Sequence, residues 1–395
     1  MGYRKFKADK LFDGENLLDH NFVLISDEQG RIEKLVPATE AGDDVETLNG
    51  ILSPGLINCH CHLELSHLKK VIPPGTGLIT FLKSVVQKRG FDADVIQKAI
   101  EQAEQEMYNN GIVAVGDISN QADAVQVKRK SKIRWHTFIE VLSISDERAP
   151  ENVEHYSQVL KTHREHLHAP NSSVLSPHAP YTISKKSFEL INERTEREII
   201  SIHNQEHPAE DELYKSGKGE FLELLEMFGF TTSPFPITGK SSLQSYLPYF
   251  NKQQIIFLVH NTFIPREDIA YALQYARANG IQLVFCLCPN ANLYIENKLP
   301  PIEPLVDAGC HIVLGTDSYS SNWQLSIAKE MQSLMVAPFF HNKPHDVALK
   351  MLLKWATSNG AKALGWENDL GSFAKGKTPG IILIDNDLSF SQRIL

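Results

Sequence analysis

The sequence predicts a (β/α)8 barrel with a small β-sandwich domain formed from both termini, and three observations support this fold class. Eight apolar, β-branched-rich segments recur along the chain, with helical patterns between them. Polar residues that can bind a ligand follow these segments, as expected at the carboxyl ends of barrel strands. Further short strand-like segments lie near both ends of the chain. A length of 395 residues exceeds the usual size of one domain, but large α/β barrels fold as one unit.

The predicted β-sandwich begins with short strands and turns in residues 3–52. In residues 21–37, NFVLISDEQGRIEKLVP, apolar alternation stops at Glu-Gln-Gly and then resumes, which is typical of a hairpin. A matching strand-like segment lies at residues 376–390. We therefore expect the first part of the β-sandwich in residues 1–53, the barrel in residues 54–355, and a terminal helix with the second part of the sandwich in residues 356–395.

The predicted barrel strands are almost continuously hydrophobic, which is typical of strands buried on both faces of a parallel sheet. They lie at residues 51–58, 111–118, 134–142, 172–177, 198–203, 255–260, 281–288 and 311–316. A helix is expected after the first strand, in the segment DADVIQKAIEQAEQEMYNNG, which ends at Gly111. Its predicted apolar face consists of Val95, Ile96, Ala99, Ile100, Ala103 and Met107.

Polar side chains follow each predicted strand at the point where it ends. In strand order they are His60 and His62, Asp117, Glu140, His178, His203 with Glu206, His260, Cys288 with Asn290, and Asp317. Because catalytic groups of such barrels lie at the carboxyl ends of the strands, this placement predicts one shared site.

His60 and His62 stand one residue apart in the segment NCHCHLE. Successive side chains of a strand point to opposite faces, so the two histidines share a face while Cys59 and Cys61 point away as small packing residues. Two imidazole nitrogens on one face can bind one ion of the Zn²⁺ or Fe²⁺ type.

Four further residues can contribute to such a centre. His203 offers a third imidazole, and Glu206, three residues on, can carry protons beside a metal-bound water. His260 ends the sixth strand, where the alternative is a core histidine with its hydrogen bonds satisfied. Asp317 can bind the metal or accept a proton from its water, and its alternative is a helix cap.

Composition narrows the class of protein. A net charge of −9 argues against nucleic acid or an anionic membrane as partner. Five cysteines, an odd number, fit a reducing compartment. The first residues lack the apolar region of a secretory signal, and no apolar run is long enough to span a membrane. We expect a cytoplasmic protein that acts on a small molecule.

Six segments, in order, resemble those of the amidohydrolase superfamily, and more narrowly its cytosine-deaminase-like branch. This branch includes adenosine-type and aminodeoxyfutalosine deaminases and triazine chlorohydrolases. The segments are SPGLINCHCHLE, SPHAPYTIS, HNQE, LVHNTF, CPNANLYI and LGTDSYSSN. The resemblance covers nearly the whole chain and agrees with a β unit built from both termini.

The resemblance implies roles for the strand-end residues. The implied ligands of one divalent metal, Zn²⁺ first and Fe²⁺ as the alternative, are His60, His62, His203 and Asp317. His260 and Asp317 would orient and activate the water, and Glu206 would protonate a ring nitrogen of the substrate. The fourth-strand segment VLSPHAP offers no lysine for the carbamate bridge of two-metal members. Related enzymes are often homodimers, so a homodimer is expected.

The implied reaction is hydrolytic deamination of an aromatic heterocycle, with a 6-aminopurine nucleoside as the first substrate class. Aminodeoxyfutalosine comes first, followed by adenosylhomocysteine and methylthioadenosine. His178 is expected to hold the ligand, Glu64 to bind the ribose, and Arg148 to bind a substrate carboxylate, with Arg89 and Arg134 as other candidates. The alternatives are a triazine chlorohydrolase, a guanine- or cytosine-type deaminase, and a non-catalytic barrel scaffold.

Overall fold

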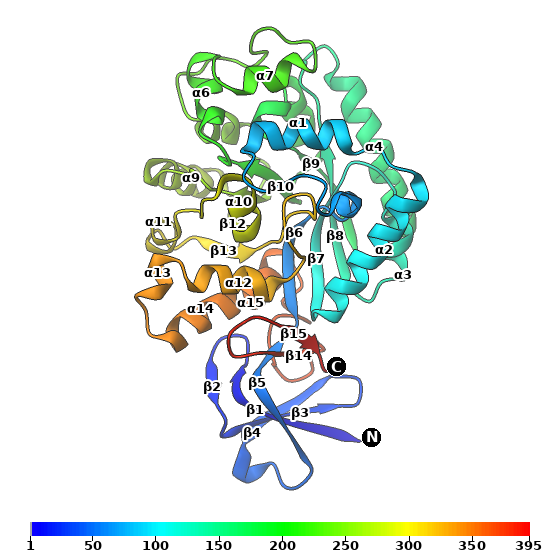
Figure 1. The fold of residues 1–395 in the computed structure, drawn as a ribbon, viewed down its shortest axis with the longest axis vertical. Helices are drawn as coiled ribbons and strands as arrows, with labels where there is room; N and C mark the ends of the chain where they lie inside the picture. The colour runs from blue at the N-terminus through cyan, green and yellow to red at the C-terminus, as the bar shows by residue number, and fades with distance from the viewer. Residues whose placement is uncertain (1) are drawn as a thin grey trace.

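A computed structural model describes residues 2–395. It contains a barrel, in the upper part of Figure 1, and a smaller β domain below it. The eight barrel strands are β6 (Leu56–Cys61), β7 (Ile112–Ser119), β8 (Arg134–Val141), β9 (Ser172–Pro177), β10 (Ile199–Asn204), β11 (Ile255–His260), β12 (Gln282–Leu287) and β13 (His311–Leu314). All neighbouring pairs are parallel within two four-stranded sheets, β6–β9 and β10–β13. The predicted fold class is confirmed.

Backbone hydrogen bonds at two seams join these sheets into a closed barrel. At the seam between β9 and β10, the His203 N–H donates to the His178 carbonyl over 2.9 Å. At the seam between β13 and β6, the N–H groups of Thr316 and Asp317 both donate to the His60 carbonyl over 3.0 Å. Both seams therefore lie at residues that were singled out as candidate site residues.

The prediction of one strand over residues 51–58 is wrong, because this segment contains the end of one strand and the start of the next. Residues 51–54 end β5 (Val45–Pro54) of the small domain, and β6 starts at Leu56. Gly55 lies between them, where an added Cβ would come within 2.2 Å of Val113 Cγ1 and 2.8 Å of the Pro379 carbonyl oxygen. Residues 51–54 and all of β6 are buried, so hydrophobicity continues across the boundary.

The helices lie around the barrel and over its ends (Figure 1). They are α1 (Leu78–Lys88), α2 (Ala93–Asn109), α3 (Val125–Lys130), α4 (Ala149–His166), α5 (Lys185–Arg194), α6 (Ala209–Ser216), α7 (Phe221–Glu226), α8 (Ser242–Tyr246), α9 (Arg266–Asn279), α10 (Pro289–Glu296), α11 (Ile302–Asp307), α12 (Ile327–Met335), α13 (Pro338–His341), α14 (His345–Ala356) and α15 (Ser358–Ala363). Among the residues described, no helix is long and apolar enough to cross a membrane.

The apolar face predicted for α2 is confirmed in its last three members. Ile100, Ala103 and Met107 are buried in the core, but Val95 is 45% exposed. Consecutive helical side chains point about 100° apart, and Ile96 packs on the core, which leaves Val95 on the outer side of the helix.

The small domain is one hydrogen-bonded sheet of seven strands with the order β15-β14-β5-β1-β3-β4, and β2 pairs with β1. Besides β5, its strands are β1 (Tyr3–Phe12), β2 (Leu17–Asp19), β3 (Phe22–Asp27), β4 (Ile32–Pro37), β14 (Ile381–Ile384) and β15 (Ser391–Arg393). The antiparallel β3–β4 pair confirms the predicted hairpin. Because β14 pairs with β5, the sheet contains both ends of the chain, whereas α15 packs against β6 and β13 of the barrel.

A buried ion pair holds the backbone that follows His62 in place. Asp117 of β7 and Lys128 of α3 are both fully buried, with Nζ 2.5 Å from Oδ2. Nζ also donates to Ser119 and Thr137, while Asp117 Oδ1 accepts the Leu63 N–H over 2.8 Å. The carboxylate thus anchors the backbone just after His62, instead of pointing into the site.

Replacing Lys128 with Met should lower the free energy of unfolding by about 3–5 kcal/mol, because it leaves the Asp117 carboxylate buried without its cation. Denaturant unfolding followed by circular dichroism measures this loss. Lys130→Met, at an exposed position of the same helix, is the matched control and should stay within about 0.5 kcal/mol of wild type.

The double variant Asp117→Asn/Lys128→Met should recover part of the loss, because neither charge is then buried alone. A Lys128→Met protein as stable as the Lys130→Met control would contradict this account of the pair.

Candidate metal centre and active site

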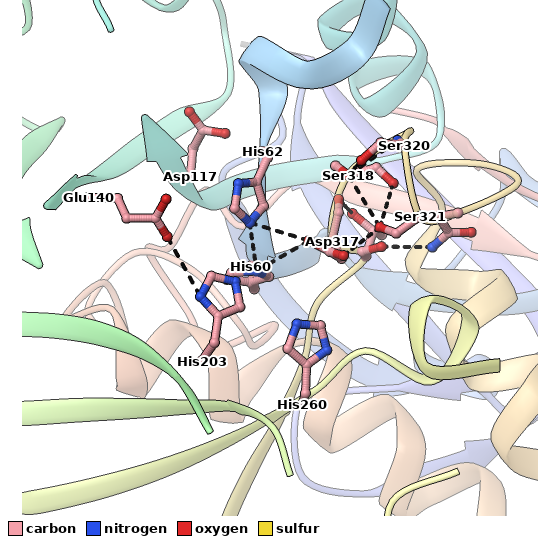
Figure 2. A network of polar contacts seen from close by, with 12 residues as sticks. His60, His62, Asp117, Glu140, His203, His260, Asp317, Ser318, Ser320 and Ser321 are labelled. Carbon is pink, nitrogen blue, oxygen red and sulfur yellow. Dashed lines mark hydrogen bonds and ion pairs between the residues drawn. The ribbon is translucent and has the colours of Figure 1, made fainter. Parts of the chain in front are cut away.

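Four candidate ligands converge at the carboxyl ends of β6, β10 and β13. Figure 2 shows His60, His62, His203 and Asp317 pointing toward one another from these strands. The Nε2 atoms of His60 and His62 are 3.2 Å apart. Asp317 Oδ1 lies 3.4 Å from the first and 3.3 Å from the second. Strand parity therefore placed both histidines on one face as expected.

These distances fit three ligands of one metal ion. Two nitrogen or oxygen atoms that lie 2.0–2.1 Å from the same ion at a near-tetrahedral angle are about 3.3 Å apart, which matches the spacing of the three atoms. His203 joins them, because candidate ligand atoms of His60, His62 and His203 all lie within 4.8 Å of one another. The His203 Nδ1 bonds the His178 carbonyl over 2.8 Å, which leaves Nε2 for an ion.

The imidazoles are in the protonation state that metal binding requires. Burial lowers the pKa of His60, lowers that of His62 to about 3, and holds the pKa of His203 well below its ordinary value. Neutral imidazoles keep a lone pair available for an ion. Three neutral imidazoles and a carboxylate form a donor set that suits Zn²⁺ or Fe²⁺.

The backbone turns sharply where the strands deliver their side chains. Gln205, His260 and Asp317 have φ values of 43°, 71° and 57°, in the left-handed region that non-glycine residues rarely adopt. The bonds from Thr316 and Asp317 to the His60 carbonyl hold the last turn, and Ser321 Oγ donates to Asp317 Oδ2. Such strain concentrates at functional sites.

Glu206 and His260 form the second part of the site. Glu206 is 4% exposed, and its Oε1 lies 3.6 Å from His260 Nε2. Burial raises the pKa of Glu206 well above its usual range, and the negative charge of Asp317 raises it further. The His260 Nδ1 bonds Asn292 Oδ1 over 3.1 Å, so its Nε2 faces the site. Burial therefore favours the protonated form of this carboxyl group, which lies against His260.

Glu210, which the sequence reasoning did not single out, holds the turn that presents Glu206. Its carboxylate accepts the N–H groups of Glu206, Gln205 and His207 over 2.7, 2.9 and 3.3 Å. An acidic residue in the first turn of a helix, here α6, was the available signal for this role.

A cavity opens above these residues. Its polar end is lined by His62, Glu140, His178, His203, Glu206, His260 and Asp317. Its mouth is apolar and lies between α1 and α7, with Phe81, Leu82, Val85 and Phe228 in the lining, and the exposed Arg89 is at the rim. The cavity can therefore take a ligand with a polar head and an apolar extension.

The structure brings one of the three predicted substrate residues to this cavity. His178 lines it, with Nδ1 2.6 Å from Thr182 Oγ1. Glu64 is turned toward the end of β7, where its two oxygens accept the N–H groups of Asn120 and Gln121 over 2.9 and 3.2 Å.

The predicted arginine lies elsewhere. Arg148 is outside the cavity lining, exposed just before α4, with its Nε 3.6 Å from Glu151. Arg134 pairs with Asp369 over 2.9 Å. Arg89, the third arginine considered, is the one at the rim.

Comparisons with known proteins agree with this site. A sequence model of the amidohydrolase family matches residues 51–393. The chain is 27% identical to an adenosine deaminase of Helicobacter pylori over 322 residues, which cover 81% of this chain and 76% of that protein. It is 27% identical to an aminodeoxyfutalosine deaminase of Nitratiruptor over 343 residues, 85% of this chain and 79% of the relative.

A solved structure supports the fold. The crystal structure of Helicobacter pylori aminofutalosine deaminase in complex with methylthio-coformycin superposes with a TM-score of 0.78 at 22% identity, covering 97% of this chain and 92% of that one. At this identity the likeness concerns the fold alone.

Proposed function

Because the chain belongs to the amidohydrolase family, we propose that it deaminates a 6-aminopurine nucleoside hydrolytically at one divalent metal. The proposed ligands are His60, His62, His203 and Asp317. One observation carries the proposal: three ligand atoms lie 3.2–3.4 Å apart directly beside the buried carboxyl group of Glu206. Zn²⁺ is the first candidate and Fe²⁺ the second.

Each residue near the centre has a proposed task. When bound, the metal supplies a water of lowered pKa as the nucleophile. Glu206 holds a proton on its buried carboxyl group and delivers it to the ring nitrogen beside the attacked carbon. His260 directs Nε2 toward Glu206, because its Nδ1 is held by Asn292. Asp317 keeps Oδ1 beside the two Nε2 atoms, because Ser321 binds Oδ2.

The shape of the cavity supports a 5′-extended nucleoside. The purine would occupy the polar end, and the extension would pass Phe81, Leu82 and Phe228 toward Arg89 at the rim. An aromatic extension that ends in a carboxylate fits this order, so aminodeoxyfutalosine remains first, before adenosylhomocysteine and methylthioadenosine. Arg89 replaces Arg148 as the proposed carboxylate ligand. The five cysteines are free thiols, which supports the expected cytoplasmic location.

Metal-loaded protein should contain about one divalent ion per chain, and His203→Ala should lose it, because a neutral imidazole is removed from the ligand set. Elemental analysis after gel filtration measures the content. His168→Ala, at an exposed position, is the control and should keep the metal. Two ions per chain would refute the mononuclear site, and full retention of the metal by His203→Ala would refute His203 as a ligand.

Glu206→Gln should keep the metal and a similar KM but lower kcat by about 10²–10⁴-fold, because the amide cannot transfer the proton. Steady-state kinetics with ammonia detection measures the loss. Glu212→Gln, an exposed acid on α6, should behave like wild type. If the Glu206→Gln protein works within tenfold of wild type, another group moves the proton.

Arg89→Gln should lower kcat/KM for a carboxylate-bearing 5′-extended adenine nucleoside about tenfold, equivalent to about 1.4 kcal/mol, and leave methylthioadenosine unaffected. Arg148→Gln is the matched control, and its kcat/KM in the same assay should equal that of wild type. A loss in Arg148→Gln instead would restore the original assignment. Higher kcat/KM for free guanine, cytosine or a chlorotriazine would end the nucleoside proposal.

A further inference from the structure

One residue that lines the cavity has a buried carboxyl oxygen that no other described residue satisfies. Glu140 is 3% exposed at the end of β8 and lines the cavity. Its Oε2 accepts the Asn120 Nδ2 over 3.1 Å, but its Oε1 has no hydrogen-bond partner within residues 2–395. Buried acceptors are nearly always paired, so this atom calls for a donor that the chain itself does not supply.

The nearest side chain donates elsewhere. The His203 Nδ1 is 3.6 Å from Glu140 Oε1, beyond hydrogen-bond range. The same Nδ1 is 2.8 Å from the His178 carbonyl, which takes its proton. His203 therefore contacts Glu140 without satisfying it.

A chain of hydrogen bonds holds the carboxylate in place. Glu64 binds the backbone N–H of Asn120 over 2.9 Å, and the Asn120 side chain binds both the Glu140 carbonyl and Oε2. Glu64, the residue expected to bind the ribose, is thus engaged in supporting Glu140. The free oxygen is positioned before any ligand arrives, which is the condition for a selective contact.

The chemistry of the substrate limits which donor can reach this oxygen. This step rests on the proposed function: an adenine nucleoside donates hydrogen bonds only from its 6-amino group and its ribose hydroxyls. Deamination requires the amino group beside Asp317 and Glu206. Figure 2 shows Glu140 beyond His203 from Asp317 and His260. Two clusters of side chains lead to the same conclusion. The candidate ligand atoms of Glu140, His178 and His203 lie close together, and those of Asp317, His60 and His260 form a separate cluster.

We propose that Glu140 Oε1 accepts a hydrogen bond from a ribose hydroxyl and makes the enzyme select ribonucleosides over deoxynucleosides. A site built around a substrate hydroxyl rejects the analogue that lacks it, because the buried acceptor then stays unpaired. Glu140 is thus a specificity residue in direct contact with substrate.

The test compares kcat/KM for adenosine, 2′-deoxyadenosine and 3′-deoxyadenosine in metal-loaded wild type, Glu140→Leu and Glu140→Gln. Wild type should disfavour one deoxy analogue at least tenfold. In Glu140→Leu that ratio should fall to about twofold, because the acceptor is gone, and Glu140→Gln should be intermediate, because the amide offers one acceptor oxygen in place of two. Glu147→Gln, exposed in the loop after β8, should keep the wild-type ratio.

Metal content and circular dichroism of the Glu140 variants distinguish contact with the substrate from a role in holding His203 in place. If Glu140→Leu does not fold, the ratio in Glu140→Gln decides. An unchanged ratio with equal losses on all three nucleosides, or loss of the metal, would make Glu140 a positioning residue for His203 and overturn the proposal. Equal use of all three by wild type would also overturn it. Absence of turnover of any adenine nucleoside by wild type would instead refute the proposed function, and this inference with it.

Discussion

The His60 carbonyl accepts two backbone hydrogen bonds, from Thr316 and Asp317, and the site depends on this contact. It joins the last barrel strand to the first, so it closes the cylinder and brings the Asp317 carboxylate beside the imidazoles of His60 and His62 in one step. Barrel closure and ligand assembly are therefore the same event.

Burial then determines the charge of the cluster. Removal from water lowers the pKa of the imidazoles and raises that of Glu206, so burial favours the neutral form of each group. Asp317 is the exception: burial raises its pKa, but the hydrogen bond from His60 and the nearby histidines hold it well below its usual value. The centre thus combines one fixed negative charge with neutral donors, which suits a cation and leaves a proton available close by.

Much of this site could be predicted from the sequence, because the carboxyl ends of parallel strands converge and alternation places His60 and His62 on one face. The rest depended on tertiary contacts that leave no local pattern. Asp117 follows its strand like the proposed ligands, yet its ion pair with the buried Lys128, a helical lysine, diverts it. Glu64 was expected at the ribose but turns to Asn120. The boundary at Gly55 escaped notice because both flanking strands are buried.

The small domain adjoins the barrel through Pro54 and Leu56, at the starting end of β6, whereas the ligands lie at its far end. Its sheet also contains both β1 and β15, so the two ends of the chain both lie in the small domain, on the side of the barrel away from α1 and α7 (Figure 1). A linker attached through either end would therefore hold the protein on a solid support with its cavity facing solution. Immobilisation in this orientation would leave substrate access between α1 and α7 unobstructed.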